Sequence, residues 1–178
     1  MSTKKIIRVL VTGATGFLGG NILKALMTQP EIEPIAACRQ REKLQRNFKG
    51  EVRMGDLMDA NYRREVVKEV DVLCSAGNWA SMWNHKAQER ERFFAPTRDL
   101  MEQAIGQGVK RIIQTNTVVI GAVKKDNNPI DDFSPTQHTG FWPHLDCLID
   151  LDAYMRANSN RGTQMVTMRL GHFIGKGN

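Results

Sequence analysis

A glycine-rich stretch near the start of the chain, VLVTGATGFLGG from Val9 to Gly20, has the residue types and spacing to bind a phosphate. Gly13, Gly16 and Gly19 lack the Cβ that prevents a backbone from turning tightly or approaching another group closely. A buried-strand pattern precedes them, and from Leu18 on an apolar residue recurs every fourth position, as on one face of a helix. The N-terminus of such a helix attracts anions, so this turn predicts a pyrophosphate site, with a purely structural turn as the alternative.

The composition is that of an ordinary globular domain. The chain has 178 residues, of which 41% are hydrophobic and 25% charged. Its 25 Lys and Arg exceed its 19 Asp and Glu, but acids are interspersed among them and no aromatic residues alternate with a basic stripe. We therefore expect no nucleic-acid partner. The 3 cysteines form no CxxC pair, and no apolar stretch reaches the roughly 20 residues of a membrane span, which predicts a cytoplasmic protein without a membrane partner or metal site.

Apolar strand-like runs alternate with helix-like stretches along the whole sequence. This alternation predicts an α/β fold with a doubly wound parallel sheet of the Rossmann type and helices on both faces. We expect helices from about Leu18 to about Gln29, at 41–48, at 60–69 and at 86–106, the last kinked or broken at Pro96. The segment 124–140 is expected to be an exposed loop. The expected strands are 6–11, 33–38, 51–55, 70–76, 110–121 and 163–175.

Five short motifs resemble those of a known family. They are TGATGFLGG at 12–20, GDL at 55–57, SAG at 75–77, GVKRIIQTNT at 108–117 and MRLGHFIG at 168–175. Together they resemble the extended short-chain dehydrogenase/reductases, also described as NAD-dependent epimerase/dehydratase-like proteins. The resemblance implies one dinucleotide-binding domain over residues 1–178, without the smaller substrate domain that follows in family members.

The resemblance also implies which residues hold the cofactor. Three sets of residues would bind the pyrophosphate, the adenine and the adjacent ribose, and a glycine after the last strand would lie in the loop beneath the nicotinamide. For Asp56 a role as a simple turn or cap residue is the alternative. The pyrophosphate residues are Gly13, Thr15, Gly16, Phe17, Leu18 and Gly19. The adenine residues are Asp56 and Leu57, the ribose residues are Ala76 and Gly77, and the glycine beneath the nicotinamide is Gly171.

The residues after the second predicted strand indicate the choice of dinucleotide. An acidic residue about 20 positions past the glycine motif would bind the ribose 2′-hydroxyl of NAD. Here the sequence is AACRQREK, with no acid before Glu42. Arg39 instead offers a permanently charged, planar group suited to a 2′-phosphate, so we predict NADP as the preferred cofactor and NAD as the alternative. A solvent-exposed Arg39 without a ligand is the other interpretation.

The catalytic positions depart from the family pattern. Family enzymes usually combine a hydroxyl residue after the fifth strand with a tyrosine followed four places later by a lysine that lowers its pKa. Thr117 falls at the hydroxyl position, but neither tyrosine of the chain has such a lysine. Alignment of the helix at 143–152 places His144 at the tyrosine position and Leu148 at the lysine position. Phe93 falls where these enzymes often keep an asparagine.

Two functions follow from this combination. The first is an NADP-dependent oxidoreductase or epimerase-like enzyme that acts on a small-molecule substrate with a modified catalytic set. In it Thr117 and His144 would be catalytic, since imidazole titrates near neutral pH and Asp146 lies close in sequence. The second is a regulator or sensor that binds the dinucleotide without chemistry, in which His144 is merely an exposed or capping residue.

Overall fold

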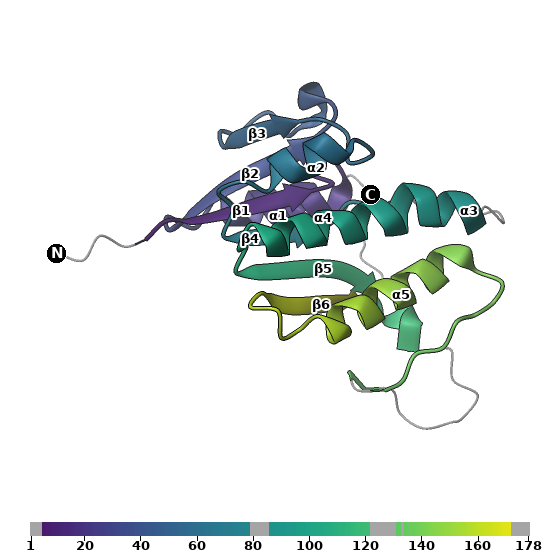
Figure 1. Cartoon of the computed structure of the whole chain (residues 1–178). Helices are drawn as coiled ribbons and strands as arrows, with labels where there is room; N and C mark the ends of the chain where they lie inside the picture. Colours follow the sequence, from purple (N-terminus) through teal and green to yellow (C-terminus); the bar gives the residue numbers. More distant parts are fainter. Residues whose placement is uncertain (1–4, 79–85, 122–130, 133, 172–178) are drawn as a thin grey trace.

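A single parallel sheet forms the centre of the protein (Figure 1). The computed structural model describes residues 5–78, 86–121, 131–132 and 134–171. Within them the strand order is β3-β2-β1-β4-β5-β6, so the chain reverses its direction of winding between β1 and β4. This order confirms the predicted doubly wound sheet. The strands are β1 (Ile7–Thr12), β2 (Ile32–Cys38), β3 (Glu51–Met54), β4 (Val72–Ser75), β5 (Arg111–Thr117) and β6 (Gln164–Leu170).

Helices cover both faces of this sheet, as predicted. The helix α1 packs on one face, whereas α2, α4 and α5 pack on the other, where α4 and α5 lie over the strands in Figure 1. The helical segments are α1 (Phe17–Leu26), a 3₁₀ turn (Arg41–Lys43), α2 (Ala60–Val66), α3 (Lys86–Glu89), a π turn (Arg90–Phe94), α4 (Ala95–Gly106), a 3₁₀ turn (Val118–Gly121) and α5 (Pro143–Ala157).

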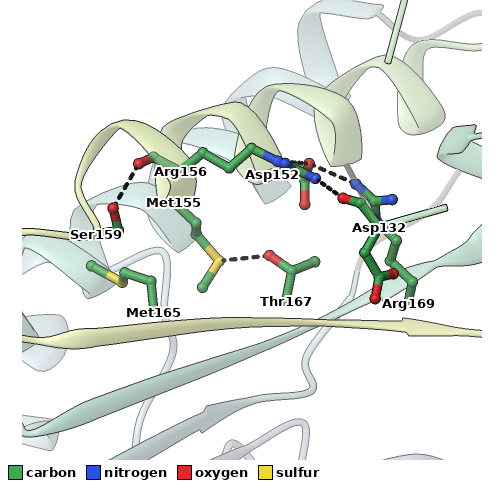
Figure 2. Close-up of a pocket in the computed structure, with 8 residues that line it drawn as sticks. All are labelled: Asp132, Asp152, Met155, Arg156, Ser159, Met165, Thr167 and Arg169. Carbon is green, nitrogen blue, oxygen red and sulfur yellow. Dashed lines mark hydrogen bonds and ion pairs between the residues drawn. The ribbon is translucent and has the colours of Figure 1, made fainter. Parts of the chain in front are cut away.

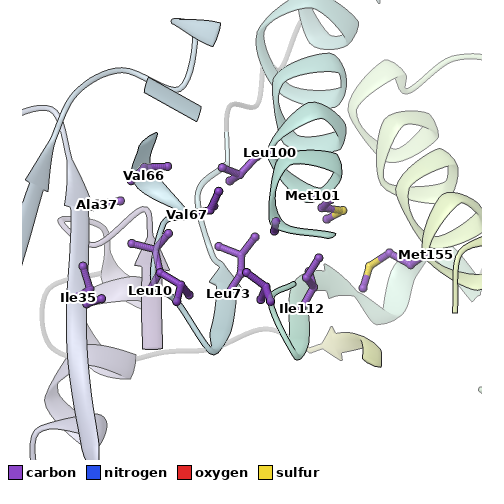
Figure 3. Packing of buried hydrophobic residues seen from close by; sticks show 13 residues of the cluster. Leu10, Ile35, Ala37, Val66, Val67, Leu73, Leu100, Met101, Ile112 and Met155 are labelled. Atoms are coloured by element: carbon purple, nitrogen blue, oxygen red, sulfur yellow. The ribbon is translucent and has the colours of Figure 1, made fainter. Parts of the chain in front are cut away.

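Alternate residues of the inner strands build two separate cores. Leu10 is fully buried on the face toward α2 and α4, whereas its neighbours Val9 and Val11 are buried on the face toward α1. Figure 3 shows the first core, in which side chains from four adjacent strands meet those of the helices. Its strand residues include Leu10, Ile35, Leu73 and Ile112, and its helix residues include Val66, Leu100, Met101 and Met155.

The helix predicted at 41–48 is wrong. Only Arg41–Lys43 form a 3₁₀ turn, and Leu44 is already extended, with φ −68° and ψ 152°. Leu44 and Phe48 instead pack against the core beneath α1, and the Gln45 side chain donates a hydrogen bond to the Gly20 carbonyl at 3.0 Å. These contacts with another element prevail over a helical tendency that spans fewer than three turns.

The long predicted helix at 86–106 is interrupted one turn earlier than Pro96. Pro96 lies in the first turn of α4, where its missing N–H is not needed. The irregularity is the π turn directly before it, in which the Ala95 N–H donates to the Arg90 carbonyl five residues back. Of the loop predicted at 124–140, residues 131, 132 and 134–140 contain no helix or strand, and the remainder lies outside the described residues.

The turn between β1 and α1 is held by very close backbone packing. Gly13 has φ +63°, and a Cβ there would lie 2.7 Å from the Ala76 carbonyl oxygen and from the Gly77 nitrogen. A Cβ on Gly19 would lie 2.2 Å from the Gly13 oxygen. The Thr12 hydroxyl accepts a hydrogen bond from the Gly77 N–H at 3.2 Å. The carboxyl ends of β1 and β4 are thereby joined tightly.

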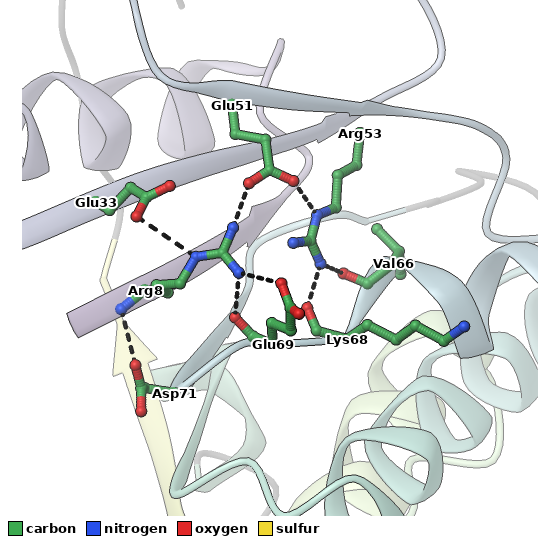
Figure 4. Close-up of polar contacts among 8 residues, drawn as sticks. All are labelled: Arg8, Glu33, Glu51, Arg53, Val66, Lys68, Glu69 and Asp71. Atoms are coloured by element: carbon green, nitrogen blue, oxygen red, sulfur yellow. Dashed lines mark hydrogen bonds and ion pairs between the residues drawn. The ribbon is translucent and has the colours of Figure 1, made fainter. Parts of the chain in front are cut away.

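At the opposite, amino end of the strands, charged side chains join β1 to β3 and to the segment before β4 (Figure 4). The Arg8 guanidinium pairs with Glu51 and Glu69 and donates to the Glu69 carbonyl at 2.8 Å. Asp71, just before β4, accepts the Arg8 backbone N–H at 3.0 Å and the Lys5 ammonium at 3.0 Å. The hydrogen bond from the Arg8 N–H is the main reason why the pKa of Asp71 is lowered.

Asp71→Asn is expected to lower the free energy of unfolding at pH 7 by about 1 kcal/mol, because the neutral amide is a weaker acceptor than the carboxylate. The folded-state pKa of Asp71 lies below its unfolded value, so this stabilisation exists above about pH 4 and is lost as the pH falls through the folded-state pKa. Urea unfolding of both proteins across this range measures the difference. A difference that stays constant down to pH 2 would contradict the assignment.

Gly13→Ala is expected to destabilise the protein by at least about 2 kcal/mol, because the methyl group meets the Ala76 and Gly77 backbone and the φ is left-handed. Gly108→Ala is the matched control. Gly108 has φ +75°, but its Cβ would meet nothing within 4 Å, so its loss is limited to the φ penalty of about 1 kcal/mol. Equal losses in urea unfolding would show that the close backbone approach contributes nothing.

Candidate functional site

A cavity of about 690 Å³ opens at the carboxyl ends of the strands, over the junction of β1 and β4. Its volume is in the range of small-molecule and cofactor sites. Three parts of the chain form it: the turn before α1, the ends of β2 and β3, and the end of β4 with the π turn and α4. Its lining includes Gly13, Thr15, Gly16, Phe17, Leu18, Gly19, Cys38, Arg39, Gly55, Asp56, Leu57, Met58, Tyr62, Ala76, Gly77, Asn78, Phe93 and Thr97.

The N-terminus of α1 faces this cavity and is suited to an anion. Gly16 is its N-cap, and within the described chain no side chain caps the helix and no acidic residue occupies its first turn. Backbone N–H groups at a helix start need acceptors, and the helix dipole favours a negative charge there. A Cβ on Gly16 would meet only the Gly13 oxygen, at 3.3 Å. A contact this short is tighter than most Cβ contacts, so a side chain at position 16 would require a small shift of the turn, and the glycine also leaves the approach to the helix start open.

At the ends of β2 and β3, Arg39 and Asp56 face each other across the rim. The Arg39 Nη1 lies 3.8 Å from the Asp56 Oδ2, and the Arg39 side chain is 77% exposed. An ion pair of this length in solvent is weak, which leaves Arg39 available to another anion. Asp56 also accepts the Met58 N–H at 3.0 Å, so it does hold a turn, the alternative role considered for it.

Tyr62 forms an apolar wall at the same end. A Cβ at Gly55 would lie 2.2 Å from the Tyr62 ring, so this glycine lets the ring pack flat against the strand end. The hydroxyl group donates to the Arg53 carbonyl at 2.6 Å. This hydrogen bond and the packing against Gly55 hold the ring in place, and burial raises the pKa of Tyr62 to about 12. Cys38 lies nearby, and burial raises the pKa of its thiol as well.

The third part of the wall contains Asn78 and Phe93, with His144 packed behind them. The Asn78 Nδ2 lies 3.1 Å from the His144 Nε2, and the Phe93 and His144 ring centroids are 5.1 Å apart. His144 is only 7% exposed and is not among the cavity-lining residues. Its Nδ1 lies 3.1 Å from a Glu89 carboxylate oxygen. Asp146, its neighbour in sequence, instead accepts hydrogen bonds from Thr139 and Gly140.

Most of the residues that the sequence assigned to a cofactor meet in this one cavity. They come from the glycine motif, from Arg39, from Asp56 and Leu57, and from Ala76 and Gly77. Gly171 is exposed after β6 and does not line it. Sequence reasoning did not identify Tyr62, Met58, Asn78 or Thr97, although Asn78 directly follows the SAG motif and could have been found there.

Thr117, the predicted hydroxyl residue, also lies outside the lining. It ends β5, and its hydroxyl accepts the Val119 N–H at 3.3 Å. The preceding Asn116 donates from its side chain to the Leu148 carbonyl at 3.0 Å, which joins β5 to α5. Leu148 itself is buried in the core beneath α5. Thr117 and His144 thus lie on elements that pack together, while both stand apart from the cavity surface.

A second cavity of about 350 Å³ lies between α5 and β6 (Figure 2). Asp152 accepts hydrogen bonds there from Arg156 Nε at 2.9 Å and from Arg169 Nη2 at 3.1 Å. Arg156 also donates to the Asp132 carbonyl at 2.7 Å. Asp152 therefore pairs with both arginines of this cavity. In the described parts of the chain we find neither a helix that could cross a membrane nor a cluster of side chains that could hold a metal ion.

Solved structures share this fold. WbmG of Bordetella bronchiseptica, in complex with NAD, matches 95% of this chain and 54% of its own chain with a TM-score of 0.77 and 19% identity. The UDP-glucose 4-epimerase of Thermus thermophilus, in complex with NAD, matches 92% of this chain and 54% of its own with a TM-score of 0.74 and 20% identity. The chain thus spans about half the length of these proteins.

Sequence comparison extends the likeness. Sterol demethylase protein B of Methylococcus capsulatus (strain Bath) is 33% identical over 118 residues, which are 64% of this chain and 35% of that protein. The chain therefore spans about a third of the length of this relative. A model of the NAD dependent epimerase/dehydratase family matches residues 9–178. With the family's fold and nearly the whole sequence matched, the chain belongs to the NAD-dependent epimerase/dehydratase family.

Proposed function

We propose that this protein binds a nicotinamide dinucleotide in the large cavity, with NADP preferred over NAD. The observation that carries the proposal is the start of α1 at Gly16, which no described side chain caps and which opens into a cavity at the β1–β4 junction. Dinucleotides bind at this point of doubly wound sheets, with the pyrophosphate on the first helix. The NAD named in the structures of WbmG and of the Thermus epimerase agrees with this class of ligand.

The residues of the cavity fit each part of such a ligand. Backbone N–H groups at the start of α1 would hold the pyrophosphate, with Gly16 allowing its approach. Tyr62 and Leu57 would contact the adenine, and Arg39 would exchange its weak contact with Asp56 for the 2′-phosphate. When bound, the nicotinamide ring can donate or accept a hydride.

Two activities are compatible with this site. The first is that of an oxidoreductase or epimerase-like enzyme that uses Thr117 and His144. The second is that of a non-catalytic regulator or sensor of the dinucleotide. The burial of His144 behind Asn78 and Phe93 favours the second, because a proton donor must reach the substrate. Leu148, at the position of the family's lysine, is buried and cannot tune an acid.

We expect NADPH to bind at least about tenfold more tightly than NADH, since a charge-assisted hydrogen bond from Arg39 contributes about 1.5–3 kcal/mol, which corresponds to about 10- to 150-fold. Calorimetric titration of both ligands measures the ratio. Arg39→Ala should reduce it to about one by weakening NADPH alone. Arg41→Ala is the matched control, since Arg41 is exposed two residues away and does not line the cavity.

Gly16→Val locates the site in the same titration. The branched side chain would fill the approach to α1 and abolish binding of both dinucleotides. Binding that survives Gly16→Val would exclude this turn as the phosphate site. A wild-type ratio near one, or a ratio that Arg39→Ala leaves unchanged, would remove Arg39 from the cofactor contacts.

The chain saturated with NADPH is expected to reduce simple aldehydes at a negligible rate. General acid catalysis typically contributes about 10²–10⁴-fold, and the described cavity wall presents no tuned acid where the family places its tyrosine. The assay follows the loss of NADPH absorbance in the parent, in His144→Ala, and in the double variant His144→Tyr/Leu148→Lys. Rapid parental turnover that His144→Ala abolishes would identify an enzyme with His144 as its acid.

A further inference from the structure

Three side chains form a continuous hydrogen-bonded chain from the cavity wall into the interior. Asn78, exposed in the cavity, lies with its Nδ2 3.1 Å from His144 Nε2. His144 Nδ1 in turn lies 3.1 Å from a Glu89 carboxylate oxygen. His144 is 7% exposed and Glu89 only 1%. We call these three residues the Asn–His–Glu relay. A carboxylate buried this deeply requires hydrogen-bonding partners, and His144 is one of them.

The chemistry of the three groups fixes the direction of each hydrogen bond. The carboxamide NH₂ of Asn78 can only donate, so the His144 Nε2 must accept and carries no proton. The proton of the neutral imidazole is then on Nδ1, which donates it to the Glu89 carboxylate. The relay therefore holds the amide nitrogen of Asn78 and leaves its Oδ1 without a partner among the described residues.

The packing around His144 keeps the relay in one geometry. The Phe93 ring lies 5.1 Å from the imidazole, centroid to centroid, and also lines the cavity. Glu89 ends α3 and Phe93 belongs to the π turn that follows, so both reach His144 from successive turns. With its ring enclosed and both nitrogens engaged, His144 cannot turn without breaking these contacts. His144 thereby orients the Asn78 carboxamide from the side that faces away from the cavity.

The position of Asn78 indicates which part of a dinucleotide it would meet. In doubly wound sheets the adenosine half lies at the end of β2, where Arg39 is found here, and the ligand crosses the turn before α1. The nicotinamide half must then lie on the β4 side. Asn78 directly follows Gly77, past the end of β4, and is exposed in the same cavity.

We propose that Asn78 binds the nicotinamide half of the dinucleotide through its Oδ1, and that His144 and Glu89 are positioning residues that hold the Asn78 carboxamide for this contact. The ligand groups that can donate to Oδ1 are the ribose hydroxyls and the nicotinamide carboxamide. His144 thus acts on the cofactor through Asn78. This inference rests on the dinucleotide site proposed above.

The test compares a whole dinucleotide with its adenosine half. NADPH and adenosine 2′,5′-bisphosphate are titrated by calorimetry into the wild-type chain and into His144→Phe, which keeps an aromatic ring against Phe93. NADPH affinity is expected to fall about five- to tenfold, the value of one hydrogen bond, while bisphosphate affinity changes less than about twofold. His138→Phe is the matched control, because it makes the same replacement at an exposed site that pairs with Asp150 outside the relay.

Variants at the two ends of the relay separate positioning from folding. Asn78→Ala leaves the buried His144–Glu89 pair intact and should reproduce the selective loss of NADPH affinity. Glu89→Gln keeps an oxygen that accepts the Nδ1 proton and should retain NADPH affinity within about twofold, whereas Glu89→Leu should lose it. Nitrogen-15 NMR of the imidazole in the wild-type chain should show His144 protonated at Nδ1 and not at Nε2.

The outcomes are distinguishable from those of the cofactor proposal. Wild-type protein that binds neither ligand would overturn both proposals. Wild-type protein that binds both, with NADPH affinity unchanged in Asn78→Ala and His144→Phe, would keep the cofactor site and overturn the relay. Equal loss of affinity for both ligands in Asn78→Ala and His144→Phe would show that these residues have only a structural role, and would overturn the relay. A proton found on His144 Nε2 would overturn the relay as well.

Discussion

The close approach of Gly13 to the backbone of Ala76 and Gly77 is the constraint on which the site depends. It occurs where β1 and β4 lie side by side, and the Thr12 hydroxyl reinforces it by accepting the Gly77 N–H. Because Gly13 has no Cβ, the two strand ends approach closely, and the start of α1 and Asn78 line one cavity. A Cβ on Gly13 would lie 2.7 Å from the backbone of Ala76 and Gly77, so the ends of β1 and β4 would have to shift.

The two ends of the cavity differ in how firmly they are held. Arg39 is mostly exposed and touches Asp56 through a single weak contact, so it can adjust to different anions. Asn78 is anchored to His144 and through it to Glu89, both of them buried. Affinity for an anion can therefore vary at the Arg39 end of the cavity without a shift of Asn78 at the other end. This division suits a ligand with one charged and one reactive half.

The sequence was sufficient where local patterns determine structure, and insufficient where distant side chains decide. Nearly continuous apolar runs and the glycine motif predicted the parallel sheet and the turn before α1, because burial on both faces and tight backbone turns restrict residue type directly. The partner of His144 was beyond such reasoning. Asp146 is near in sequence but accepts from Thr139, whereas Glu89, 55 residues away, reaches the imidazole because α3 and the π turn pack on α5.

The Arg8 network and the large cavity lie at opposite ends of the same strands. The Arg8 side chain joins β1 to Glu51 of β3, and the Arg8 backbone N–H joins β1 to Asp71 before β4. These contacts reinforce the sheet at the end of the strands that is opposite the cavity. Substitutions around the cavity therefore leave the contacts of Arg8 in place. The residues that face a ligand can change while this end of the sheet keeps its reinforcement.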